Sequence, residues 1–191
     1  MRVIAGQFRS RPLIAPKGSD TRPTSDRLRE TLFNVLAPRI ESSVFLDLYA
    51  GSGAVGIEAL SRGASEAVFV ENSESALRTI RANLSSLGIR GSYTLEPRSV
   101  SAALNRLAAT GRTVNLVFLD PPYADAAEYE STLNLLGGEC LPLLAPDAIV
   151  IAEHLKKLSL DDRYASLRRY RILKQGDSAL SFYSPSTTSP L

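Results

Sequence analysis

Short, largely apolar runs alternate with amphipathic stretches over most of this 191-residue chain. The runs have four to six residues, a length that predicts buried β-strands. Between them, apolar side chains recur at helical spacing, most clearly at Leu77, Ile80, Leu84 and Leu87. Strands that alternate with crossover helices are typical of a parallel sheet, so we predict an α/β fold. The predicted strands cover residues 44–48, 67–70, 92–95, 114–119 and 148–152.

Both ends of the chain depart from this alternation. Residues 3–14 alternate loosely and predict a short hairpin, and an amphipathic helix that begins near Asp26 and ends at Pro38 follows it. Residues 168–173 and 180–183 predict a second hairpin, which would add antiparallel strands to the sheet. We therefore expect a basic N-terminal extension over residues 1–39, one domain over 40–184 and a disordered tail over 185–191.

The composition is that of an ordinary soluble globular protein, with 44% hydrophobic and 22% charged residues. The lone cysteine, Cys140, cannot form an internal disulfide, and the residues after Met1 are too short an apolar stretch for a signal peptide. No run approaches the roughly 18 apolar residues of a membrane span. These features predict a cytoplasmic protein, and its small size predicts a monomer.

The formal net charge of +2 is unevenly distributed. Residues 1–39 hold seven Arg and one Lys against three acidic residues, which gives +5 and leaves −3 for the other 152 residues. Arginine forks match phosphate oxygens, so a basic leading segment favours binding to a nucleic-acid backbone. A solvated basic face or local salt bridges are the alternative interpretation.

A glycine-rich turn follows the strand at 44–48. Asp47 is followed by Gly51, Gly53 and Gly56, which form a G-x-G-x-x-G pattern between a strand and a helix. Bare backbone at such a turn lets a ligand approach closely, and Glu71 ends the next strand, where a carboxylate can accept the hydroxyls of a ribose. These residues suit a dinucleotide and S-adenosylmethionine equally, so they leave the ligand open.

The strand at 114–119 runs into Asp120-Pro121-Pro122-Tyr123, which favours a methyltransferase. An exocyclic amino group on a base is a poor nucleophile, so an enzyme must hold both of its N–H groups and aim its lone pair at the methyl donor. The Asp120 carboxylate and the Pro121 carbonyl can accept those two hydrogen bonds from a loop made rigid by proline. Tyr123 offers a ring on which an unstacked base could lie.

Together these motifs resemble class I S-adenosylmethionine-dependent methyltransferases, and the segment from Thr21 to Asn34 narrows the resemblance to the RsmD family. That family methylates the exocyclic N2 of a guanine in 16S ribosomal RNA. The resemblance implies a Rossmann-like, seven-stranded, mostly parallel sheet of order 3-2-1-4-5-7-6. It also implies helices on both faces, an N-terminal hairpin plus helix, and a small-subunit ribosomal particle as the partner.

The resemblance also assigns roles by position. Asp120, Pro121 and Tyr123 would take the target guanine, and S-adenosylmethionine would contact Asp47, Gly51, Gly53, Glu71, Ser99 and Val100. An Asp or Asn that many relatives have after the third strand is replaced here by Arg98-Ser99-Val100, which weakens the adenine assignment. Candidates for RNA binding are Arg9, Arg11, Arg22 and Arg29.

No metal is expected, because the lone His154 has no cysteine cluster beside it, and Cys140 is expected to be a small core residue.

Three other interpretations stay open at the level of the sequence. An NAD(P)-dependent oxidoreductase would explain the glycines and Glu71 but leave Asp120-Pro121-Pro122-Tyr123 without a role. A DNA adenine-N6 methyltransferase uses the same tetrapeptide, but the short chain leaves little room for a segment that reads duplex sequence. A noncatalytic RNA-binding module of the same fold would keep the basic segment without the chemistry.

Overall fold

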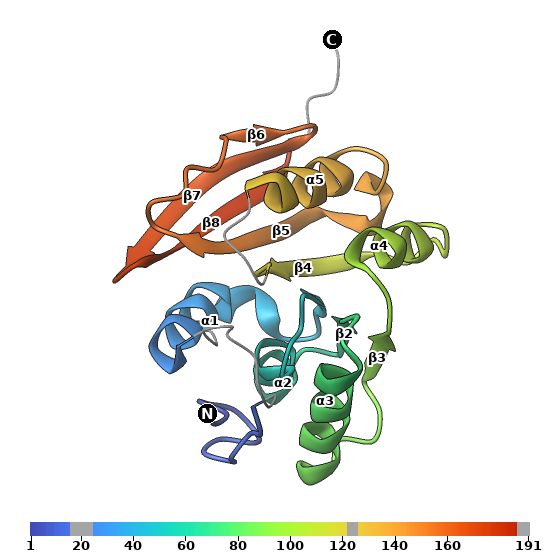
Figure 1. The fold of residues 1–191 in the computed structure, drawn as a ribbon, viewed down its shortest axis with the longest axis vertical. Helices are drawn as coiled ribbons and strands as arrows, with labels where there is room; N and C mark the ends of the chain where they lie inside the picture. Colours follow the sequence, from blue (N-terminus) through green and yellow to red (C-terminus); the bar gives the residue numbers. More distant parts are fainter. Residues whose placement is uncertain (16–24, 122–125, 187–191) are drawn as a thin grey trace. The chain divides into compact units, whose positions relative to one another are not determined.

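A computed structural model describes residues 1–15, 25–121 and 126–186 of the chain. The chain divides into two compact units, residues 1–99 and residues 100–191. Each unit contains its own helices and strands, most of which are labelled in Figure 1.

The described residues of the first unit form three parallel strands and three helices. Its strands lie in the order β3-β2-β1, as predicted. Two of the helices begin at serine caps: the Ser25 hydroxyl accepts a hydrogen bond from the Leu28 N–H, and the Ser73 hydroxyl accepts one from the Ala76 N–H. In chain order the elements are α1 (Asp26–Ile40), β1 (Val44–Leu48), α2 (Ala54–Ser61), β2 (Glu66–Val70), α3 (Glu74–Ser86) and β3 (Tyr93–Glu96).

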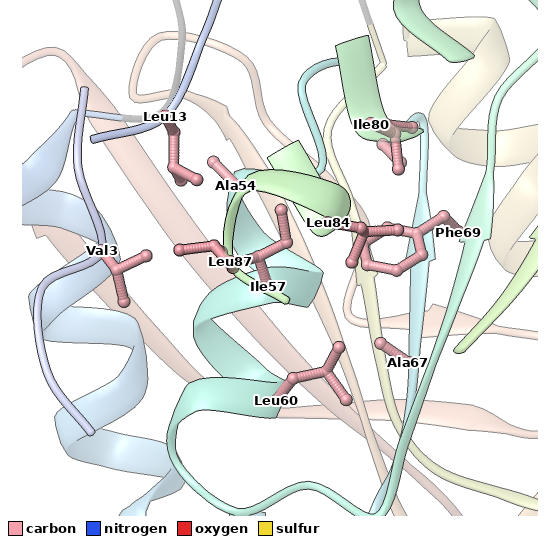
Figure 2. Packing of buried hydrophobic residues seen from close by; sticks show 11 residues of the cluster. Val3, Leu13, Ala54, Ile57, Leu60, Ala67, Phe69, Ile80, Leu84 and Leu87 are labelled. Carbon is pink, nitrogen blue, oxygen red and sulfur yellow. The ribbon is translucent and has the colours of Figure 1, made fainter. Parts of the chain in front are cut away.

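The core of the first unit lies between β2 and helices α2 and α3. The Phe69 ring from β2 packs among Ile57 of α2 and Ile80 and Leu84 of α3, as Figure 2 shows. On the same face of the sheet, Phe33 of α1 stacks on Phe45 of β1. Val3 and Leu13 belong to the same buried cluster as Phe69, so the N-terminal segment is part of this core.

The second unit joins one parallel strand pair to an antiparallel extension. Strand β4 pairs with β5 in parallel, and the order continues β5-β8-β7-β6 with antiparallel pairs. Helix α5 packs on this extension, where Tyr129 donates a hydrogen bond to the Glu153 carbonyl. The elements are α4 (Val100–Ala108), β4 (Val114–Leu119), α5 (Ala126–Gly137), η1 (Leu141–Leu143), β5 (Leu144–Leu155), β6 (Arg163–Tyr164), β7 (Leu167–Gln175) and β8 (Ser178–Pro185).

Two details of the predicted fold are wrong: the number of strands and the end of the first helix. The described residues contain eight strands, because the two-residue strand β6 adds an edge to the predicted hairpin of β7 and β8. The predicted N-terminal hairpin is present in short form: Arg2 and Pro12 form an antiparallel bridge, and the Val3 N–H donates to the Arg11 carbonyl at 2.9 Å and the Leu13 N–H to the Met1 carbonyl at 3.0 Å. Helix α1 continues past Pro38 to Ile40, because the rigid ring disturbs mainly the turn before it.

None of the described helices combines the length and the apolar character that crossing a membrane requires.

Gly56 of α2 packs directly against the Phe69 ring of β2. A Cβ added there would lie 2.3 Å from Cε1 of Phe69. We therefore expect Gly56→Ala to lower the free energy of unfolding in urea by about 1–3 kcal/mol, as overpacked cores commonly do. Gly91→Ala is the matched control, since no atom of the described residues lies within 4 Å of a Cβ at that position. Equal stability of the two variants would contradict this close packing.

Candidate functional site

The turn from β1 into α2 has a left-handed backbone at three of five residues. Gly51 has a φ of 54° and Gly53 a φ of 77°, conformations that glycine adopts without strain. Tyr49 has a φ of 61°, which is uncommon for a residue with a side chain and is often found at functional sites. A Cβ at Gly51 would meet only the Tyr49 carbonyl oxygen, at 3.9 Å. The turn therefore offers open backbone at Gly51, as the glycine pattern predicted.

Asp47 lies buried beneath this turn, at the end of β1. Its carboxylate accepts a hydrogen bond of 2.9 Å from the Gly56 N–H in the first turn of α2. Burial raises the pKa of Asp47 to about 8, the Gly56 hydrogen bond opposes that rise, and the nearby charge of Glu71 adds to it. Asp47 thus ties β1 to α2 and changes charge near neutral pH.

Glu71, at the end of β2, holds the other side of the turn. One carboxylate oxygen accepts a hydrogen bond of 2.8 Å from the Gly51 N–H, and the other accepts from the N–H groups of Asn72 and Ser73. Within the described chain these bonds use three of the roughly four acceptor positions of a carboxylate. Glu71 can therefore accept a hydrogen bond from one ribose hydroxyl while it retains the hydrogen bond from the Gly51 N–H.

The segment after β3 carries the two other predicted cofactor contacts. Ser99 is exposed, and Val100 is buried at the start of α4. The preceding Arg98 forms a 2.9 Å ion pair with Glu96, whose side chain is buried. Arg98 therefore pairs within its own segment.

Asp120 and Pro121 follow β4 directly, as the sequence predicted. The last four residues of β4 are fully buried, whereas Asp120 is half-buried and Pro121 is buried. A carboxylate at the end of a buried strand is held by a rigid element. Pro122 and Tyr123 lie outside the described residues, so the stacking role of Tyr123 stays a prediction.

The predicted RNA contact at Arg29 is wrong. The Arg29 side chain is completely buried, donates a hydrogen bond to an Asp26 carboxylate oxygen at 3.0 Å and lies 3.9 Å from a Glu58 carboxylate oxygen. A guanidinium in this position cannot reach a phosphate, and burial lowers its pKa while the two acids oppose that shift. Arg29 follows the salt-bridge interpretation that the sequence left open.

The other predicted RNA contacts lie in the N-terminal segment. Arg9 is exposed, and Arg11 is exposed but donates a hydrogen bond of 2.9 Å to the Ser86 carbonyl at the end of α3. Arg22 lies outside the described residues. The exposure of Arg9 and Arg11 is compatible with contact to an RNA backbone.

Glu58 is a structural residue that the sequence analysis missed. Its fully buried carboxylate on α2 accepts hydrogen bonds from the Ile4 N–H at 2.7 Å and the Ala5 N–H at 3.0 Å, and it pairs with Arg62 at 2.7 Å. An acid in the otherwise apolar helix at residues 54–61 was the available sign, because a buried carboxylate requires partners.

Asn83 is the second missed residue, and it links the N-terminal segment to the glycine turn. This buried side chain on α3 accepts a hydrogen bond from the Ile14 N–H at 2.8 Å and donates to the Ile14 carbonyl at 3.0 Å. The same amide donates to the Ser52 carbonyl between Gly51 and Gly53 at 3.0 Å. The sequence sign is weak: a polar residue beside Leu84 on the apolar face of α3.

His154 and Cys140 have ordinary structural surroundings. The His154 ring, whose pKa burial lowers, is within 2.9 Å of the Leu155 carbonyl and of the Ser181 hydroxyl. Cys140 is buried, with its sulfur 3.5 Å from the Asn105 side-chain oxygen. The described part of the chain holds no group of three or more His, Cys, Asp or Glu placed to bind a metal.

Comparisons with known proteins agree with this arrangement. A family model described as conserved hypothetical protein 95 matches residues 1–184. Ribosomal RNA small subunit methyltransferase D of Escherichia coli (strain K12) is 41% identical over 153 residues, 80% of this chain and 74% of that protein. YlbH of Bacillus subtilis (strain 168) is 33% identical over 183 residues, 96% and 98% of the two chains.

A solved structure supports the same fold. The structure of yhhF from Escherichia coli is 35% identical to this chain and covers 98% of it, and the chain covers 99% of yhhF. The TM-score of the pair is 0.83. The α/β methyltransferase fold, with parallel strands and an antiparallel extension, is therefore confirmed.

The raised pKa of Asp47 has a consequence for stability. Between the ordinary carboxyl pKa near 4 and the folded value of about 8, the folded protein keeps a proton that the unfolded chain has released. The unfolded state binds fewer protons, so this group makes stability fall as pH rises through that window. The free energy of unfolding, measured in urea, should fall between pH 5 and pH 8 in the wild-type protein. We expect Asp47→Asn to remove the part of this fall that is due to Asp47. Asp177→Asn, at an exposed turn, is the control, and a wild-type slope in Asp47→Asn would contradict the assignment.

Proposed function

Because this chain belongs to the RsmD family, described by the model of conserved hypothetical protein 95, we propose that it methylates the exocyclic N2 of a guanine in 16S ribosomal RNA. The methyl donor is S-adenosylmethionine. The observation that carries the proposal is Asp120-Pro121-Pro122-Tyr123 directly after β4, in a chain whose relatives include a named small-subunit rRNA methyltransferase. We also propose that the enzyme acts as a cytoplasmic monomer on an assembling small-subunit particle.

The glycine turn and the acids around it form the proposed cofactor site. Gly51 and Gly53 border the methionine part of the donor, Asp47 lies beneath them, and Glu71 accepts a ribose hydroxyl. The residues fit the group, because Gly51 has open space on the side of a Cβ and Glu71 keeps an acceptor position. Ser99 and Val100 are the proposed adenine contacts.

The proposed chemistry is a direct transfer without a covalent enzyme intermediate. S-adenosylmethionine supplies an electrophilic methyl carbon attached to a sulfonium. The Asp120 carboxylate and the Pro121 carbonyl accept hydrogen bonds from the two N–H groups of guanine N2, which directs the lone pair of the nitrogen at that carbon. Tyr123 stacks against the base. As N2 bonds to the methyl carbon, the carbon–sulfur bond would break and S-adenosylhomocysteine would leave. Asp120 would stabilise the positive charge on N2 until its extra proton passes to solvent.

Asp120→Ala tests the substrate half of this site. We expect kcat to fall by a factor of about 10² to 10³, which is the common cost of one lost preorganised contact, with an unchanged Kd for S-adenosylhomocysteine. Asp120→Asn retains one acceptor oxygen and should recover part of the rate. The measurement is single-turnover methyl transfer with calorimetric titration of the cofactor product. Wild-type turnover of Asp120→Ala would exclude the proposed site.

Glu71→Gln tests the proposed cofactor site. Comparing the binding of two ligands that differ only in the ribose hydroxyls isolates the ribose contact. Wild-type protein should bind S-adenosylhomocysteine more tightly than its analogue without ribose hydroxyls, because one hydroxyl donates to the Glu71 carboxylate. Glu71→Gln should bind both more weakly and discriminate less between them, since its amide replaces one acceptor oxygen by a donor. A variant that keeps the full wild-type discrimination would refute the ribose role, even if its overall affinity dropped.

Transfer of labelled methyl groups to small ribosomal subunits from cells that lack this protein tests the whole proposal. Nucleoside analysis should recover the label as N2-methylguanine, and parallel reactions on naked rRNA would tell whether the particle is required. Label in duplex DNA as N6-methyladenine would establish the DNA methyltransferase instead. Cofactor binding without transfer to any substrate would favour the noncatalytic RNA-binding module.

A further inference from the structure

The second unit carries a basic segment as strongly charged as the N-terminal one. Residues 156–174 contain seven Lys or Arg against Asp161 and Asp162, a net charge of +5. The segment includes β6 and most of β7, a strand that among the described residues pairs along its length with β8 and at only two positions with β6. The roles proposed above use none of these charges.

A β-bulge in β7 places an aromatic ring and a guanidinium against the same residue of β8, Phe182. The register with β8 shifts between Arg169 and Arg171, so Tyr170 and Arg171 together oppose Phe182. The Tyr170 ring centroid lies 6.3 Å from that of Phe182, and the Arg171 guanidinium carbon lies 5.9 Å from the Phe182 centroid. In a regular strand, consecutive side chains would point to opposite faces.

Arg168 lies on the same face as this pair. It pairs with Ser184, and Ser184 shares a face with Phe182 because the two are two residues apart in β8. Arg168 and Arg171 are exposed, and the Tyr170 side chain remains 54% exposed although its ring contacts the buried Phe182. We call Arg168, Tyr170 and Arg171 the β7 stripe.

We propose that the β7 stripe binds a single-stranded segment of the ribosomal RNA substrate other than the target guanine. Arg168 and Arg171 contact phosphates, and an unpaired base stacks on Tyr170, the combination by which proteins hold single strands. The inference rests on the proposed function, because it deepens the recognition of the same RNA. The fixed Phe182 beneath the stripe lowers the cost of ordering the Tyr170 ring on binding.

The competing explanation for these charges is that they prevent the edge of the sheet from pairing with a strand of another chain. Lys and Arg on an edge strand discourage pairing with another chain. That role does not account for Tyr170, because an exposed aromatic residue favours β-pairing. The bulge that brings Tyr170 beside Arg171 and over Phe182 is better explained by a ligand with both a negative backbone and flat rings.

The test compares three variants with a charge-matched control in the full-length protein. Arg168→Gln/Arg171→Gln removes both cations of the stripe, Tyr170→Ser removes the ring, and Tyr170→Phe retains it. Arg78→Gln/Arg81→Gln is the control, since it removes two exposed arginines from α3. Each protein is measured for binding to 16S rRNA over a salt series, for KM and kcat of methyl transfer, and for cofactor Kd.

For the double arginine variant we expect weaker binding and a salt slope lower by about 1.4, that is about 0.7 for each phosphate contact. Tyr170→Ser should raise the RNA Kd about 5- to 100-fold, and Tyr170→Phe should restore it. In the double arginine variant and in Tyr170→Ser the effect should fall on KM, with kcat and cofactor Kd near the wild-type values. The control pair should bind RNA with the wild-type salt slope.

The outcomes separate this inference from the proposed function. If wild-type protein transfers no methyl group to RNA, the proposed function fails whatever the variants do. If wild-type protein is active and the stripe variants keep the wild-type KM and salt slope, the inference fails alone. Weaker binding to small subunits with unchanged binding to naked rRNA would identify a ribosomal protein as the partner, and self-association without a change in KM would identify edge protection. Either result would overturn the RNA contact.

Discussion

The buried carboxylate of Glu58 is the interaction on which the first unit depends. It joins α2 to the backbone of the N-terminal segment, to Arg62 and, more distantly, to Arg29 of α1. A buried charge is tolerated only when hydrogen bonds and opposite charges replace its lost hydration, and Glu58 has both. The same carboxylate therefore fixes the N-terminal segment, including the turns that carry Arg9 and Arg11, against the helix that follows the glycine turn.

The acids around the glycine turn have structural roles before any ligand arrives. Asp47 holds the start of α2 through Gly56, and Glu71 holds the turn through Gly51. Such bonds preorganise the backbone, so less order has to be created when a cofactor binds. A change at either acid alters the shape of the turn as well as its contacts with a ligand, which is why discrimination between two ligands is more informative than affinity for one.

Much of the fold follows from local patterns, and the exceptions have physical reasons. Strand β4 has the predicted bounds because a largely apolar run meets two prolines, and α3 begins after its predicted Ser73 cap. The edge strand β6 has only two residues, too few to produce a pattern. The turns between Arg2 and Pro12 are held by Glu58 and Ser61 from α2, which accept hydrogen bonds from the Ile4 and Phe8 N–H groups and lie more than 50 residues away in the chain.

The candidate site was predictable where the chemistry is local. Gly51, Gly53 and Asp120 follow strands, and a strand end determines their position. Arg29 could not be assigned from the sequence, because an arginine on an amphipathic helix is exposed or buried according to the acids that other elements bring to it, here Glu58. Asn83 was missed for the same reason, since its partners Ile14 and Ser52 belong to distant segments.

The bulge in β7 also affects how related sequences should be aligned. Because Tyr170 is the extra residue against β8, a relative with one residue fewer between Leu167 and Leu173 would have a regular ladder at this point. The flanking residues would keep their partners and their faces, because Arg169 already pairs with Tyr183 and Arg171 with Phe182, and only the Tyr170 ring would be lost. Strand length, and not residue identity alone, therefore decides whether a homologous hairpin can display an aromatic ring and a guanidinium together.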